Sequence, residues 1–132
     1  MKDKLNKLGL NALVKSKATS YEEQGNPVYY AITPYLDRIN ADYKNKRAER
    51  MCKKDGDDFD FIVVMETRNK VAVKNIIDQK NYGKVFRLLD FTTTPADIDD
   101  PWYTRDFETC FLQIERGVEH FIDYLVKGGY LN

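Results

Sequence analysis

The sequence has no excess of either charge and no long hydrophobic run. Lysine plus arginine and aspartate plus glutamate each number 21, so no overall field draws the chain toward nucleic acid or anionic lipid. No apolar stretch approaches the length of a membrane span, and the basic N-terminus lacks the apolar core of a signal peptide. These absences predict a cytoplasmic protein with no nucleic-acid or membrane partner.

Cysteine and histidine are also scarce. The two cysteines, Cys52 and Cys110, are expected to be free thiols because the cytosol keeps such pairs reduced. The single histidine, His120, lies beside the apolar Phe121 with no metal-ligand pattern nearby, so we expect a packed or surface side chain. We predict no metal site and no cofactor.

The sequence does contain alternating helix and strand patterns. With 132 residues, 42% of them hydrophobic, the chain can bury one core and is too short for two. One helix is expected after Pro27, and Pro34 either kinks this helix or restarts it. The alternation implies a parallel sheet with helices on both sides. The other expected elements are helices over residues 2–8 and 67–78 and strands over residues 11–17, 59–65 and 84–89.

The C-terminal helix has the clearest pattern. Gly128 and Gly129 are expected to end it, as Gly9 is expected to end the first helix. Apolar residues at spacings of three and four define its buried face: Phe107, Cys110, Phe111, Ile114, Val118, Phe121 and Leu125.

Four segments, in order along the chain, carry a family resemblance: residues 16–27, 59–69, 84–91 and 100–103. The first reads Ser-Lys-Ala-Thr-Ser, then Glu-Glu and Gly-Asn-Pro; the second is a strand ending in Met-Glu-Thr-Arg-Asn; the third is a strand; and the fourth is Asp-Pro-Trp-Tyr. They resemble, in order, four segments of the low-molecular-weight protein tyrosine phosphatases: the stretch after the second strand, the strand that ends in Met-Asp-x-x-Asn, the last strand and the general-acid loop. Glu66 replaces the usual aspartate of the second segment. The resemblance implies a flavodoxin-like α/β fold in a single domain over residues 1–132.

The resemblance also assigns roles in the acid loop. Asp100 would protonate the leaving phenolate, and Pro101 would stiffen the backbone beside it. Trp102 and Tyr103 would form an aromatic wall against the phenyl ring of phosphotyrosine. On local sequence alone the Asp-Pro pair is an ordinary turn signal, and Asp99 is a rival acid that does not precede proline.

Other residues would line or support the site. Tyr21 and Glu22 belong to a loop that would help to set peptide preference, although a solvated loop is the alternative. Ser16 matches the serine that steadies the phosphate loop. Asn69 would orient neighbouring loops, or it is simply a polar residue in the first turn of a helix.

The nucleophile of this chemistry is not visible in the sequence. In the family, a Cys-x5-Arg loop between the first strand and the first helix holds the attacking thiolate and cradles the phosphate. Here residues 1–5 resemble the middle of that first helix. We therefore expect an N-terminally truncated chain that lacks its first, interior strand, with an open sheet that can form a homo-oligomer.

One segment satisfies Cys-x5-Arg literally, from Cys110 to Arg116. It lacks the glycine and small residues that let amides turn inward around an anion, and burial of the thiol would raise its pKa. Cys52 has Asp58, not arginine, six positions on. Neither cysteine is predicted to be the nucleophile.

Three functions are compatible with the family resemblance. The first is a phosphatase that hydrolyses phosphotyrosine proteins or small aryl phosphates in its complete form and is inactive as this chain. The second is a pseudophosphatase binding module that keeps the aromatic wall of Trp102 and Tyr103 for contacts with a partner. The third, an arsenate reductase on the same fold, needs redox cysteines after the third strand, and residues 66–82 contain none.

Overall fold

The computed structural model describes residues 1–19 and 49–131. The helix expected after Pro27 and the loop expected at Tyr21 and Glu22 lie outside the described residues. Of the helices in the described ranges, none combines the length and apolarity needed to cross a bilayer. The elements are α1 (Lys2–Leu8), α3 (Lys53–Asp58), β1 (Ile62–Val64), α4 (Thr67–Lys74), η2 (Gln79–Lys84), β2 (Val85–Arg87), η3 (Leu88–Phe91), α5 (Pro101–Thr104) and α6 (Phe107–Lys127).

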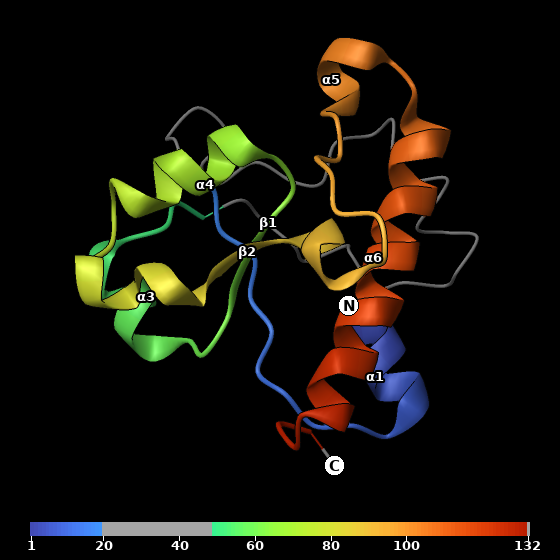
Figure 1. The fold of residues 1–132 in the computed structure, drawn as a ribbon, viewed down its shortest axis with the longest axis horizontal. Coiled ribbons are helices and arrows are strands. Elements are labelled where there is room, and N and C mark those ends of the chain that lie inside the picture. Colours follow the sequence, from blue (N-terminus) through green and yellow to red (C-terminus); the bar gives the residue numbers. More distant parts are fainter. Residues whose placement is uncertain (20–48, 132) are drawn as a thin grey trace.

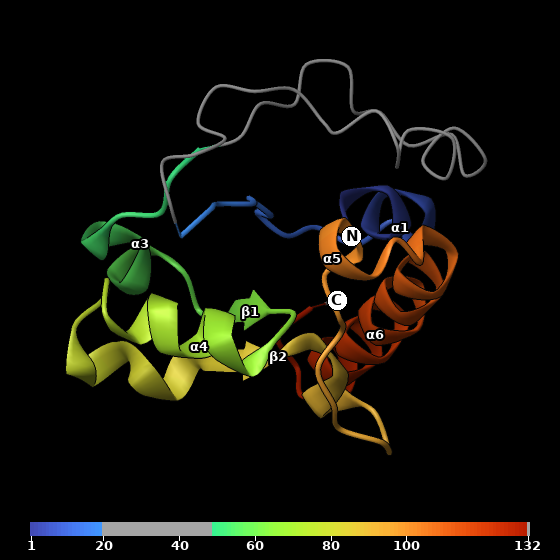
Figure 2. The same ribbon diagram turned by 90° about the horizontal axis from the view of Figure 1, so that it is seen from above.

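A parallel pair of strands forms the centre of the molecule. β1 and β2 pair in register from Ile62 opposite Val85 to Val64 opposite Arg87. Helices α3 and α4 lie on one side of the strands, and α1, α5 and α6 lie on the other (Figures 1 and 2). The expected parallel sheet with helices on both faces is therefore present.

Both strands are shorter than predicted. The ladder has three residue pairs because the backbone after Arg87 turns into the 3-10 helix η3, so the chain beyond Val64 has no partner strand to pair with. The strand expected over residues 11–17 is a wrong prediction. In the described ranges this segment has no ladder beside it, and the nearest pairing is a single parallel bridge between Ala18 and Arg50.

The helix boundaries follow the sequence more closely. α1 ends at Gly9, whose φ of 69° is left-handed and favours glycine. α4 ends at Lys74, earlier than the predicted helix over 67–78. α6 runs from Phe107 to Lys127 and is capped by Gly128, as predicted.

Two apolar clusters flank the strands. One joins α1, η3 and α6 through Leu5, Leu88, Leu89, Ile98, Val118, Phe121, Ile122 and Leu125. The other joins the α3 to α4 side through Met51, Val64, Val73, Ile77 and Val85. Val118, Phe121 and Leu125 of the predicted helix face are buried, and the predicted Cys110 and Ile114 are half-buried.

Candidate active site

The candidate site begins where the carboxyl ends of the two parallel strands meet. After β1 the chain passes through Met65 and Glu66 into α4, and β2 ends at Arg87. Loops at this edge of a parallel sheet are where α/β proteins place ligand sites. The Asn69 side chain accepts a hydrogen bond from the Glu66 amide at 3.0 Å, which fixes the turn into α4.

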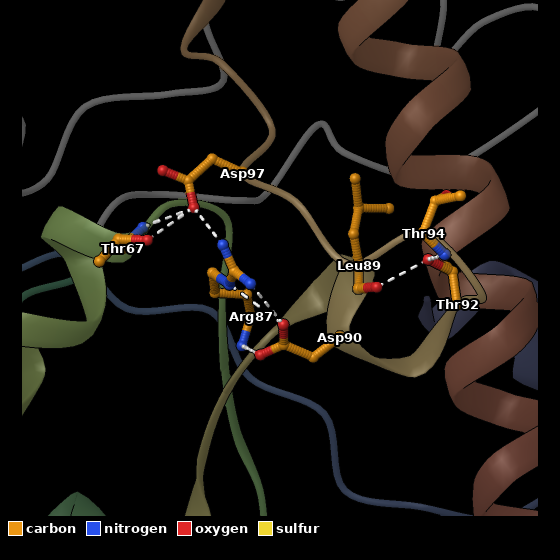
Figure 3. A network of polar contacts seen from close by, with 7 residues as sticks. All are labelled: Thr67, Arg87, Leu89, Asp90, Thr92, Thr94 and Asp97. Atoms are coloured by element: carbon orange, nitrogen blue, oxygen red, sulfur yellow. Dashed lines mark hydrogen bonds and ion pairs between the residues drawn. The ribbon is translucent and has the colours of Figure 1, made fainter.

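Asp97 joins the two loops at this edge (Figure 3). One of its carboxylate oxygens, Oδ1, accepts hydrogen bonds from the Thr67 amide at 2.9 Å, the Thr67 hydroxyl at 2.8 Å and Arg87 Nη1 at 2.9 Å. The Arg87 guanidinium and the Thr67 donors hold the pKa of Asp97 below its ordinary value. Asp97 is therefore a charged anchor between the end of β2 and the start of α4.

Arg87 is itself held on a second side. Its Nη2 and Nε donate to Asp90 Oδ1 at 2.9 and 3.1 Å, and its amide donates to Asp90 Oδ2 at 2.9 Å. The carboxylates of Asp97 and Asp90 raise the pKa of Arg87 further above its ordinary value. The guanidinium is thus fixed between two carboxylates.

Ile98 provides an apolar anchor next to the polar one. Its amide donates to the Met65 carbonyl at 2.9 Å, and its side chain is 1% exposed in the cluster on the α6 side. The main chain is therefore fixed two residues before Asp100.

Asp100 immediately precedes the short helix α5. Its carbonyl accepts hydrogen bonds from the amides of Tyr103 and Thr104 at 3.1 and 3.2 Å, and Pro101 takes the first helical position, which its fixed φ favours. The Asp100 side chain is 39% exposed. As whole residues, Asp99 is exposed and Asp100 is half-buried.

The far end of α5 is fixed by the start of α6. Arg105 has a φ of 61°, a left-handed conformation unusual for a residue with a side chain. The next residue, Asp106, caps α6 by accepting from the Thr109 amide at 3.1 Å and the Thr109 hydroxyl at 2.7 Å. These bonds lower the pKa of Asp106.

Arg68 links the acid to the opposite loop. Its Nη2 lies 3.6 Å from Asp100 Oδ2 and 3.2 Å from Glu66 Oε1, and its guanidinium carbon lies 5.2 Å from the centre of the Tyr103 ring. Interaction with Tyr103, and secondarily with the Glu66 charge, raises the pKa of Arg68. Tyr103 remains 71% exposed, so its ring is accessible to a ligand.

The other predicted site residues lie on three different segments. Trp102 lies in α5 beside Tyr103 in sequence. Ser16 is exposed in the segment between α1 and the Ala18 bridge. Asn69 is in the first turn of α4, at the same sheet edge as Asp97.

Of the two cysteines, Cys110 occupies a site unsuited to nucleophilic attack. Cys110 is half-buried on α6, and burial, followed by the charges of Asp100 and Asp106, raises the pKa of its thiol. Cys52 is exposed just before α3. Both ends of the Cys110–Arg116 segment lie within one continuous helix, whose amides point along the axis and cannot surround an anion. Residues 1–19 and 49–131 hold no group of three or more His, Cys, Asp or Glu side chains that could bind a metal.

The sequence reasoning missed Asp97, Arg87 and Arg68. Asp97 contacts residues 30 and 10 positions away, so no local motif marks it. Its only signal is indirect, because it lies in the segment that leads from the last strand to the acid.

Comparison with known proteins shows the family of the chain. A profile of the family described as low molecular weight phosphotyrosine protein phosphatase matches residues 1–129. The chain belongs to this family. The low molecular weight protein-tyrosine-phosphatase PtpA of Staphylococcus haemolyticus is 32% identical over 119 residues, which cover 89% of this chain and 75% of PtpA.

Solved structures of the phosphatase family share the fold. YfkJ from Bacillus subtilis matches with a TM-score of 0.82 at 28% identity, covering 86% of this chain and 73% of YfkJ. A low molecular weight phosphotyrosine phosphatase from Vibrio cholerae matches with a TM-score of 0.85 at 22% identity, covering 97% and 85%, a likeness of fold alone. The predicted family and flavodoxin-like α/β class are confirmed.

Proposed function

We propose that this chain contributes the general-acid side of a phosphotyrosine phosphatase site, with Asp100 as the proton donor. The observation that carries the proposal is the position of Asp100. It follows a doubly anchored segment at the carboxyl edge of the sheet and directly precedes a helix that presents Tyr103. A general acid must be held at a defined place to protonate the leaving oxygen in the transition state.

The substrate class follows from the rim beside the acid. Cleavage of an aryl phosphate expels a phenolate, and Asp100 would give it a proton as the phosphorus–oxygen bond breaks. The exposed Tyr103, with Trp102 from the same helix, would pack against the aromatic ring. Phosphotyrosine proteins and small aryl phosphates fit this description, and by the family resemblance Tyr21 and Glu22 would help to set peptide preference.

We also propose that these 132 residues alone do not hydrolyse aryl phosphates. A covalent route needs a thiolate held by inward-facing amides and an arginine. Cys110 is half-buried within a continuous helix, and Cys52 has Asp58 in place of the arginine six positions on. Ser16 and Asn69 would support such a phosphate loop only when the loop is present. The N-terminal truncation of a single domain stays a prediction.

The test uses p-nitrophenyl phosphate as the substrate. Chain 1–132 should give no hydrolysis above a protein blank. The same chain joined before Met1 to the strand, Cys-x5-Arg loop and first helical turns of a related enzyme should hydrolyse it. Turnover by the unjoined chain that Cys110→Ser abolishes would overturn both the proposal and the exclusion of that thiol.

A binding module is the second candidate, and one observation favours it. Arg68 over the face of Tyr103 gives the rim a cationic and an aromatic group that need no nucleophile. Calorimetry of the unjoined chain with a phosphotyrosine peptide tests this function. Binding that Tyr103→Ala weakens, with no hydrolysis of the peptide, would favour the module over the enzyme.

The homo-oligomer also stays a prediction. β1 has a strand partner on one edge only within the described residues, and an open edge invites pairing with another chain. Size-exclusion chromatography with light scattering measures it. A sharp monomer that melts cooperatively would contradict it.

A further inference from the structure

The loop after η3 contains three consecutive threonines in different surroundings. Thr92 is buried, and its hydroxyl donates to the Leu89 carbonyl at 2.7 Å (Figure 3). Thr93 and Thr94 are exposed. The Thr94 amide donates to the Thr92 hydroxyl oxygen at 3.2 Å, so the Thr92 side chain holds the loop in the conformation that presents Thr94.

The Thr94 hydroxyl lies at the fork of an arginine. Both terminal nitrogens of Arg116, Nη1 and Nη2, lie 3.3 Å from the same atom, Thr94 Oγ1. A guanidinium fork is matched best by a group with two acceptor oxygens, such as a carboxylate or a phosphate. A single hydroxyl oxygen shared by two donors at the long end of the hydrogen-bond range uses this fork poorly.

Close packing of η3 on α6 brings the loop and the arginine together. A Cβ atom at Gly117, next to Arg116, would lie 2.6 Å from the Leu88 side chain, so glycine permits the approach. Leu88 and Leu89 are buried in the cluster that includes α6 residues. The distance between Thr94 and Arg116 is therefore set by buried contacts, although both residues are at the surface.

We propose that Thr94 is a phosphoacceptor site and that Arg116 binds the phosphate it receives. A protein kinase would supply the reaction: Thr94 Oγ forms a bond to the γ-phosphorus of a nucleoside triphosphate, the bond to the nucleoside diphosphate breaks, and the hydroxyl proton passes to the kinase base. The product carries a charge of about −1.5 to −2 and three acceptor oxygens. Two of these oxygens can accept from Nη1 and Nη2 in parallel.

The neighbouring residues explain why Thr94 and not Thr92 would be the acceptor. The Thr92 oxygen is buried and already has two hydrogen-bond partners within the loop. Thr94 is exposed and precedes Pro95, which disfavours helical backbone at Thr94 and favours an extended one. Thr93 shares the exposure but has no arginine contact among the described hydrogen bonds, and it serves as the internal control.

The modification would act on the segment that leads to Asp97. A phosphate held by Arg116 would tie the loop to α6 just before the anchor of the candidate acid loop. We expect the loop and α6 to separate less readily, and the melting temperature to rise accordingly.

The first test locates the phosphate. Chain 1–132 is incubated with a proline-directed serine/threonine kinase and ATP, and phosphopeptides are mapped by mass spectrometry. The expected product is phosphorylated at Thr94 and disappears in Thr94→Ala. No incorporation, or phosphate on Thr92 or Thr93 instead, would overturn the acceptor assignment.

The second test concerns the arginine and uses phosphothreonine installed at position 94 during translation. The phosphate should raise the melting temperature by about 3–6 °C, and Arg116→Gln should abolish that rise while changing the unmodified chain little. Phosphothreonine at position 93 should give no such rise. An equal rise with and without Arg116 would overturn the assignment.

A phosphorus NMR titration provides a readout independent of melting. Contact with the guanidinium favours the dianion, so the titration midpoint of phosphorylated Thr94 should lie below the usual value of about 6 and return to it in Arg116→Gln. Equal midpoints in the two proteins would show that the phosphate does not meet Arg116.

Discussion

The two halves of the segment that carries Asp100 are held very differently. Asp97 and Ile98 are fixed by three hydrogen bonds to one carboxylate oxygen, a main-chain bond to Met65 and a side chain that is 1% exposed. Asp100 and α5 lie at the surface, where the Asp100 side chain is 39% exposed and 3.6 Å from the exposed Arg68. The approach to the acid is therefore anchored in part by a buried side chain, whereas the acid itself is accessible to solvent.

Because of this difference, the two halves of the segment should respond differently to substitution. Buried contacts carry large free energies, whereas exposed ion pairs carry little. Substitutions at Asp97 or Ile98 should therefore lower the stability of the fold. Substitutions at Asp100 or Arg68 should alter the local order or the activity of the acid loop without unfolding the protein.

The largest effect is expected at Ile98. Ile98→Ala should lower the free energy of unfolding by about 2–5 kcal/mol, because it removes buried methyl groups and leaves a cavity. Ile98→Val, as the matched control, should cost about 0.5–1.5 kcal/mol. Urea unfolding followed by circular dichroism measures both, and equal, negligible losses would mean that Ile98 is not an anchor.

A smaller, pH-dependent effect is expected at Asp97. Asp97→Asn should lower the free energy of unfolding by about 1–2 kcal/mol near neutral pH, since it removes a charge-assisted bond to Arg87 in a partly exposed position. The folded-state pKa of Asp97 lies below its ordinary value of 3.8, so its stabilisation is present above that value and is lost as the pH falls through the folded pKa.

Urea unfolding at a series of pH values measures this dependence. The difference between the parent chain and Asp97→Asn should shrink as the pH falls below about 4. Asp99→Asn is the matched control, because Asp99 is exposed. Its free energy of unfolding should equal that of the parent chain near neutral pH and in acid. A gap that widens in acid would contradict the assigned ion pair.

The smallest effect on stability is expected at Arg68. Arg68→Gln should leave the urea midpoint unchanged, because the side chain is exposed. It should, however, speed hydrogen exchange at the amides of Tyr103 and Thr104, which bond to the Asp100 carbonyl. Arg116→Gln is the control; if it speeds exchange at these amides as much, Arg68 has no specific role in α5.

The sequence predicted the helices better than the strands for a physical reason. α1 and α6 are specified by their own periodicity and glycine ends, which are local signals. A strand also needs a neighbour, and residues 11–17 have no ladder beside them in the described structure despite their strand pattern. The strand β2 ends early because Leu88 begins a turn of 3-10 helix that sequence alone does not distinguish from strand.

The site was predictable only where it has a motif. Asp100, Pro101 and Tyr103 were predicted through their resemblance to a family segment; Asp100 precedes α5, and Pro101 and Tyr103 lie within it. Asp97 and Arg87 were missed because their contact joins separate segments of the fold. The roles of Asp100 and Tyr103 stay proposals that activity must test.

The most direct test compares two adjacent carboxylates in the joined protein that carries a Cys-x5-Arg loop before Met1. Asp100→Asn should lower kcat on aryl phosphates by about 10²–10⁴, and the loss should shrink for leaving groups that need no proton. Asp99→Asn should change kcat little. If Asp99 proves to be the sensitive residue, or if neither substitution matters, Asp100 is not the general acid and the account of this site is wrong.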